Sequence, residues 1–136
     1  KYNPNNKRCD MRYLMLAALF LLIIIVGSIA TIYYVQNEAH MLQDQLKEME
    51  KSITEENWEK SYVLFKSFEE KWAVIDHKWS MVIDHTEIDY INMYLGELEA
   101  FIKTQDKSSA LAKLSSLELL VKHIPEREFP SLKNII

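Results

Sequence analysis

The stretch YLMLAALFLLIIIVGSIATIYYV, residues 13–35, contains no charged side chain over 23 residues. A helix of this length rises about 35 Å, enough to cross a hydrocarbon core of roughly 30 Å. Tyr13 at its start and Tyr33 and Tyr34 at its end are aromatic residues of the type enriched at membrane interfaces. The stretch therefore predicts a transmembrane helix.

The charges on either side of this span indicate its orientation. Residues 1–12 carry a net charge of +3, residues 36–136 carry −7, and the first lysine after the span is Lys47. Because cytoplasmic flanks are enriched in Lys and Arg, we expect residues 1–12 to be a short basic cytoplasmic segment. Residues 36–136 are then the extracytoplasmic domain of a single-pass cell-membrane protein.

A cleaved signal peptide is the alternative interpretation of the same stretch. Ser28, Ile29 and Ala30 form a small-x-small sequence of the kind that signal peptidases cleave. The apolar region of a signal peptide is about 7–15 residues long, which is shorter than residues 13–35. We therefore expect the span to be retained as a signal anchor.

Within the span, Gly27 and Thr31 place two small side chains one helical turn apart. Such a pair lets two transmembrane helices approach closely, although pairs of this kind also arise by chance. Self-assembly through this face stays open as an alternative.

Residues 36–136 lack the turn signals of a β or α/β domain. Between Asn37 and Ile124 there is one glycine and no proline. Strand-rich folds need frequent turns, which favour Gly and Pro. The predicted fold class is all-α: an N-terminal transmembrane helix followed by an extracytoplasmic antiparallel bundle of three to four helices.

The first apolar stripe of this domain continues directly from the membrane span. Its members lie three or four residues apart, as on one face of a helix. Two interpretations stay open: one helix that runs unbroken from the span to about Ser52, or a break near Gln36 and Asn37. The stripe consists of Val35, Ala39, Leu42, Leu46, Met49 and Ile53.

An aromatic stripe marks the second helix, which we expect to begin at Thr54, a capping residue followed by two glutamates. All three tryptophans of the chain belong to it. Core packing explains such a stripe more often than a ligand groove does. Its members are Trp58, Tyr62, Phe65, Phe68, Trp72, Ile75, Trp79 and Val82.

Two further helices follow, capped by Thr86 and Asp106, and Pro125 is expected to end the last one. The apolar tail residues Leu132, Ile135 and Ile136 are expected to fold back onto the bundle. No loop should exceed about four residues, so neighbouring helices should pack antiparallel. The inner faces are Ile88, Ile91, Leu95, Leu98 and Ile102 for the third helix, and Ala110, Leu114, Leu117, Val121 and Ile124 for the fourth.

The one polar cluster with ligand types suited to zinc or manganese surrounds His85, Glu87 and Asp89. His77 lies eight residues before His85, about 80° out of alignment on a straight helix, so these two histidines do not share an ion. Capping and first-turn roles at a helix junction are the favoured explanation of the cluster. The other histidines, His40 and His123, are expected on the surface.

Other kinds of chemistry have no counterpart in the sequence. There is no phosphate-binding glycine loop, nucleophile elbow or CxxC pair. The basic residues of the acidic domain are scattered, which argues against nucleic-acid binding. The single cysteine, Cys9, precludes an internal disulfide. We predict no enzyme, and no catalytic, cofactor-binding or metal-ligating residue.

Several short motifs are spread over nearly the whole chain. They are Asn57-Trp58-Glu59-Lys60, Lys71-Trp72, Trp79, His85-Thr86-Glu87-Ile88-Asp89, His123-Ile124-Pro125-Glu126 and Leu132-Lys133-Asn134-Ile135-Ile136. In this order, behind an N-terminal anchor, they resemble the small single-pass membrane proteins of Gram-positive, often spore-forming, bacteria grouped as domain-of-unknown-function family 4363. The resemblance implies a bacterial cell-membrane protein without an established activity. It also implies that a multi-pass membrane protein of the YetF type is a partner.

We expect a membrane-anchored helical interaction module, an accessory or scaffolding subunit of a bacterial membrane protein complex. Its expected partners are the lipid bilayer and either another membrane protein or further copies of itself. Two alternatives remain. One is an extracytoplasmic ligand- or metal-sensing domain around His85, Glu87 and Asp89, and the other is a self-assembling structural membrane protein.

Overall fold

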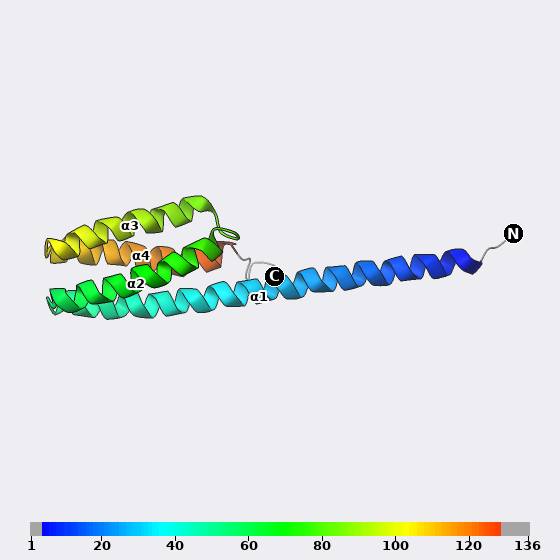
Figure 1. The fold of residues 1–136 in the computed structure, drawn as a ribbon, viewed down its shortest axis with the longest axis horizontal. Helices are drawn as coiled ribbons and strands as arrows, with labels where there is room; N and C mark the ends of the chain where they lie inside the picture. The colour runs from blue at the N-terminus through cyan, green and yellow to red at the C-terminus, as the bar shows by residue number, and fades with distance from the viewer. Residues whose placement is uncertain (1–3, 129–136) are drawn as a thin grey trace. The chain divides into compact units, whose positions relative to one another are not determined.

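The computed structural model describes residues 4–128, with side chains for residues 11–125, and all its regular elements are α-helices. The predicted all-α class is confirmed. The chain divides into two compact units, residues 1–34 and residues 35–136. The tail residues Leu132, Ile135 and Ile136 lie outside the described part. The helices are α1 (Pro4–Thr54), α2 (Trp58–Trp79), α3 (His85–Lys103) and α4 (Lys107–Glu128) (Figure 1).

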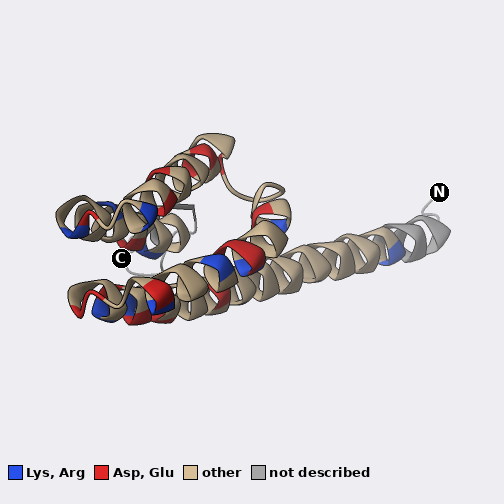
Figure 2. Ribbon diagram, turned by 60° about the vertical axis from the view of Figure 1, so that its left-hand side comes forward, with Lys and Arg blue, Asp and Glu red and all other residues tan. Residues whose placement is uncertain are grey.

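The first unit consists of the N-terminal part of α1. From Met11 to Ala30 every side chain is exposed, although the segment is strongly apolar. The helix is long enough and apolar enough here to cross a membrane. Figure 2 shows this part of the helix without charged residues beyond Arg12. Of the two possibilities left open for residues 36–53, the structure has the unbroken helix.

The second unit is an antiparallel bundle formed by the C-terminal part of α1 together with α2, α3 and α4. The stripes predicted for α1, α3 and α4 are buried in full, from Val35 to Ile124. In α2, Trp58 and Tyr62 are half-buried at the edge of this core. The inward position predicted for Val82 is wrong. Val82 is exposed in the α2–α3 loop, and Ile83 is buried instead.

Two helix connections have nearly the same geometry. Glu56, after α1, and Gln105, after α3, have φ values of 59° and 58°. In both turns the next residue donates its backbone N–H to a carbonyl five residues earlier, from Asn57 to Ser52 and from Asp106 to Phe101. This is the Schellman arrangement, which ends a helix through one left-handed residue. Both turns use a residue other than glycine there.

Two predicted helix starts are wrong, one after the first of these turns and one after the α2–α3 loop. Thr54 is the last residue of α1, and the Asn57 side chain accepts the Lys60 N–H at 3.1 Å. Thr86 does not cap α3, because the Asp84 carboxylate accepts the Thr86 N–H at 2.7 Å. Asp106 caps α4 as predicted, accepting the Ser109 N–H at 3.1 Å. The capping residue is thus the first side-chain acceptor after each turn.

The prediction that Pro125 ends the last helix is also wrong, because α4 continues to Glu128 with Pro125 inside it. Proline removes one backbone donor and strains the preceding turn, at a cost of about 3 kcal/mol. Ile124 and Pro125 are both buried, so their packing offsets part of that cost.

Candidate interaction surface

Three polar residues interrupt the apolar face of α1 at seven-residue spacing: Glu38, Gln45 and Ser52. Seven residues are close to two helical turns, so the three side chains project along one line. Each directly precedes a member of the buried stripe. Glu38 and Ser52 each contact a residue of α2, so we call this line the polar seam.

At the end of the bundle that carries the α1–α2 turn, the polar groups of the seam are hydrogen-bonded. The Ser52 and Ser61 hydroxyls lie 2.9 Å apart, and both residues are buried. Both hydroxyls also lie within hydrogen-bond distance of the Asn57 backbone carbonyl, at 3.1 and 2.8 Å. Because each hydroxyl has one proton, two of these three contacts are donated at a time. A buried hydroxyl costs free energy unless it is hydrogen-bonded, and here every hydroxyl has a partner.

At the other end of the bundle, the seam ends in a buried carboxylate. Glu38 is 8% exposed, and its Oε2 accepts a hydrogen bond from the Trp79 indole Nε1 at 3.1 Å. Its other carboxylate oxygen lies 3.6 Å from the Lys78 ammonium. Buried polar pairs of this kind fix the register of two helices.

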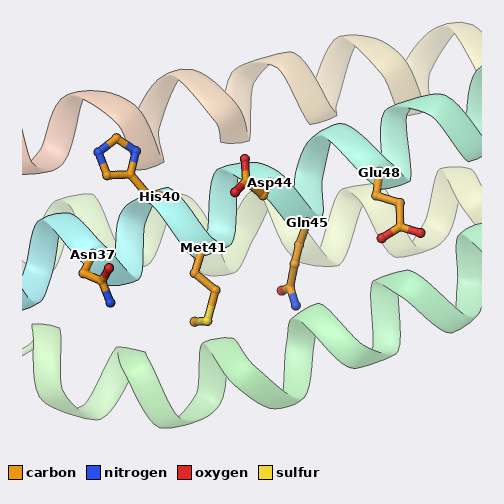
Figure 3. Close-up of a pocket in the computed structure, with 6 residues that line it drawn as sticks. All are labelled: Asn37, His40, Met41, Asp44, Gln45 and Glu48. Atoms are coloured by element: carbon orange, nitrogen blue, oxygen red, sulfur yellow. The ribbon is translucent and has the colours of Figure 1, made fainter.

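Between these ends, Gln45 is different. Its side-chain oxygen is buried and has no hydrogen-bond partner in the structure. It lines a shallow groove on α1, and Figure 3 shows Asn37, Met41 and Gln45 pointing toward α2. The remaining lining residues are His40, Asp44 and Glu48.

A second hollow lies between α1 and α4, and His40 lines it as well. On its α4 side it is lined by Lys122 and Pro125, and on its α1 side by Gln36, Ala39 and Gln43. The His40 side chain therefore lies between the groove and the second hollow and lines both. Its exposed position was expected from the sequence.

A hydrogen bond joins α2 to α3, and an edge-to-face pair of indole rings lies within α2 beside it. The Trp72 Nε1 donates to the Asn92 side-chain oxygen at 2.6 Å. The rings of Trp72 and Trp79 lie edge to face, with centroids 5.7 Å apart. Such aromatic pairs contribute about 0.5–1.5 kcal/mol beyond the area they bury.

On the surface, one carboxylate joins α2 and α3. Glu99 lies 2.9 Å from the Lys103 ammonium and 3.0 Å from the Lys66 ammonium. Hydrogen bonds from Lys103 and then Lys66 lower the pKa of the Glu99 carboxyl. Hydrogen bonds to Glu69 and Glu99 raise the pKa of Lys66.

The cluster of His85, Glu87 and Asp89 lies in the first turns of α3. The Thr86 backbone N–H lowers the pKa of Asp84, as expected for a capping carboxylate. Within residues 11–125, no three side chains of His, Cys, Asp or Glu are grouped so that they could hold a metal ion. The capping interpretation accounts for the geometry of Asp84.

The Gly27–Thr31 pair lies on the apolar helix as predicted. The Thr31 hydroxyl donates to the Gly27 carbonyl at 2.9 Å. A side-chain carbon built on Gly27 would meet no atom within 4 Å. The glycine is therefore not required by any contact among the described residues.

The polar seam was not predicted from the sequence, although a signal for it existed. Glu38, Gln45 and Ser52 each fall three residues after one stripe member and one residue before another, which is itself an inward position. This periodicity was overlooked because only apolar residues were considered as inward-facing. The seam could have been found by asking which polar residues share the period of the apolar ones.

The described residues define a class: an all-helical protein that joins a long apolar helix to a small antiparallel bundle. The chain belongs to the family described as "Domain of unknown function (DUF4363)", whose model matches residues 29–135. The match covers the whole bundle and begins within the apolar segment. No curated protein and no solved structure matches the chain significantly.

Proposed function

We propose that the chain is a membrane-anchored interaction module, an accessory or scaffolding subunit of a bacterial membrane protein complex. Residues 13–35 cross the cell membrane, residues 1–12 lie in the cytoplasm, and residues 36–136 form the extracytoplasmic bundle. The observation that carries the proposal is the exposure of every side chain from Met11 to Ala30. Apolar surface on this scale is unstable in water and stable in lipid.

The bundle supports a binding role more than a chemical one. Its buried residues are apolar except for Glu38, Ser52 and Ser61, and these three are engaged in contacts that hold α1 against α2. The surface groove around Met41 combines a thioether with amide, imidazole and carboxylate groups. Methionine adapts its shape to different partners, and this mixture suits a protein surface.

Co-purification from native membranes in mild detergent tests this proposal. We expect a multi-pass membrane protein to be recovered with the chain in fixed proportion. Met41→Glu should reduce that recovery, because it places a charge in the groove. Val63→Glu is the matched control, since Val63 is also an exposed apolar residue but lies outside the groove.

Equal recovery of the membrane partner with both variants would show that the groove is not the binding surface. A chain that is always extracted alone and monomeric would contradict the accessory role itself. A chain released from membranes by salt or alkali, without detergent, would contradict the anchor.

Self-assembly is a second candidate, favoured by the open surface beside Gly27. A second copy of the helix could approach closely there, since glycine presents no side chain. The two candidates differ in what is recovered: a heterologous membrane protein in the first, and only further copies of this chain in the second.

A further inference from the structure

The α2–α3 loop exposes two adjacent apolar residues. Met81 is 71% exposed and Val82 is 43% exposed, whereas their neighbours Trp79 and Ile83 are buried. The loop is ordered by hydrogen bonds from the Val82 and Ile83 backbone N–H groups to the Trp79 carbonyl, at 2.9 and 2.8 Å. The exposure of Met81 and Val82 is thus built into a defined turn.

This loop lies at the end of the bundle where the chain leaves the apolar segment. Trp79, which directly precedes the loop, is hydrogen-bonded to Glu38. Glu38 follows Tyr34, the last residue of the first unit, by four residues, which is about 6 Å of helical rise. Even a fully extended connection would span only about 14 Å. Within the bundle, the loop therefore lies at the end where residue 35 connects to residues 1–34.

The same end of the bundle contains all four histidines of the chain, one on each helix. His40 follows Glu38 on α1, His77 precedes Trp79 on α2, and His85 begins α3. His123 lies on α4 beside Lys122 and Pro125, which face α1 across the second hollow. All four are exposed. Imidazole is an amphipathic ring suited to the boundary between water and an apolar phase.

The opposite end of the bundle differs in composition. It consists of the two Schellman turns, whose exposed residues include Glu56 and Gln105. An ion pair of 3.0 Å joins Lys107 to Glu56 across these turns. Both ends of the bundle therefore carry charged groups, since Lys78 pairs with Glu38 and the Asp84 carboxylate caps α3 beside the loop. Unlike the turn end, the loop end adds an exposed apolar pair and four imidazole rings.

We propose that the α2–α3 loop, through Met81 and Val82, contacts the lipid bilayer surface next to the membrane span. This inference rests on the proposed anchoring of residues 13–35. Burial of this apolar pair among lipid headgroups removes it from water, as for interfacial segments of other proteins. The loop is then a second membrane contact, which holds the bundle close to the bilayer.

The test uses the full chain with Cys9→Ser, reconstituted in vesicles of phosphatidylcholine and phosphatidylglycerol. Single cysteines at Met81→Cys, Val63→Cys and Ile24→Cys carry an environment-sensitive nitrobenzoxadiazole label. Nitroxides on lipid headgroups and on mid-chain carbons act as quenchers. Val63 is the matched control, because it is 63% exposed and lies 16 residues before Trp79 on α2, about 24 Å away along the helix.

We expect headgroup nitroxide to quench the Met81 label at least about twofold more than the Val63 label, because interfacial residues lie within about 5–10 Å of the headgroup boundary. The Ile24 label should be quenched by mid-chain nitroxide. Far-UV circular dichroism should show the same helicity for all three variants, since each replaced side chain is exposed.

The outcomes separate the two proposals. Quenching at Ile24 with equal, weak quenching at Met81 and Val63 overturns the loop contact and leaves the anchor intact. A blue shift at Met81 without lipid quenching identifies a protein surface as the occupant and also overturns it. Absence of quenching at Ile24 overturns the anchor, and the inference with it.

Discussion

The indole Nε1 of Trp79 donates a hydrogen bond of 3.1 Å to the Glu38 carboxylate, across 41 residues of sequence. Both residues are buried, and the bond joins the first turn of the bundle part of α1 to the last turn of α2. At the opposite end, the Ser52–Ser61 contact joins the same two helices. Two polar contacts thus fix the register of α1 against α2 at both ends.

Replacing Glu38 with alanine should lower the free energy of unfolding by about 2 kcal/mol, because the Trp79 N–H would be buried without an acceptor. Urea titration in detergent, followed by far-UV circular dichroism, measures this change. Glu38→Gln retains an oxygen acceptor and should lose less. Glu50→Ala removes an exposed carboxylate and serves as the control. A loss at Glu38→Ala no larger than at Glu50→Ala would show that the bond adds no stability.

Replacing Gln45 with leucine should raise the free energy of unfolding by about 1 kcal/mol. The variant removes a buried oxygen that has no partner and adds apolar surface beside the core. The same urea titration measures the gain. Gln36→Leu, at an exposed position of the same helix, should change stability little. A loss of stability at Gln45→Leu would show that the amide oxygen is paired in the folded protein.

Replacing Gln105 with glycine should raise the melting temperature, and replacing it with valine should lower it. A residue with a side chain costs roughly 1–2 kcal/mol in the left-handed conformation, and a β-branched side chain is the least suited to it. Glycine avoids that cost, although its greater freedom in the unfolded chain offsets part of the gain. Thermal unfolding followed by circular dichroism distinguishes the two variants. Equal melting temperatures would contradict the positive φ at Gln105.

Stability should fall as the pH is lowered through the range in which carboxylates are protonated. Hydrogen bonds lower the pKa of Glu99 from 4.5, and those of Asp84 and Asp106 from 3.8. A carboxyl whose folded pKa is lowered stabilises the fold above its unfolded pKa, and this contribution disappears as the pH falls through the folded value. The urea midpoint, measured from neutral pH to about pH 3, should therefore decrease.

Glu99→Gln is the control for this acid response. It removes the charge that Lys66 and Lys103 share, so its urea midpoint should be lower at neutral pH and should change less with acid. A variant with an unchanged pH profile would show that Glu99 contributes nothing to acid sensitivity.

Gly27→Leu should reduce crosslinking between copies of the chain in a bilayer if the second candidate function holds. A larger side chain keeps two helices apart, and nothing within the chain itself opposes the substitution. Chemical crosslinking of the full chain in vesicles measures this effect. Val26→Leu is a neighbouring control that keeps an exposed apolar residue. Crosslinking that is equally strong in both variants excludes this face.

The buried stripes were predictable because they follow from periodicity alone. The α1 stripe from Val35 to Ile53, and the inner faces of α3 and α4, agree with the structure residue for residue. Burial of an apolar face is the dominant favourable contribution to folding, so it leaves the clearest trace in a sequence. The residues of the polar seam have the same helical spacing, but a search for apolar residues does not find them because they are polar.

The helix boundaries were less predictable, since they depend on single backbone conformations. Glu56 and Gln105 adopt the left-handed conformation that glycine favours, so the usual sequence signal for a helix end is missing at both turns. Asn57 therefore caps α2 three residues later than Thr54 would have done. Pro125 caused the opposite error. Proline usually marks a helix end, but here it lies inside α4, which continues to Glu128.

All three tryptophans of the chain lie on α2: one half-buried at its start, one beside Asn92 and one against Glu38. Ultraviolet emission excited in the indole band thus originates from a single helix of the four. Excitation at the red edge of the indole band, where the seven tyrosines do not absorb, follows that helix without an extrinsic dye. Binding of a partner to that helix would change the wavelength and the intensity of this emission.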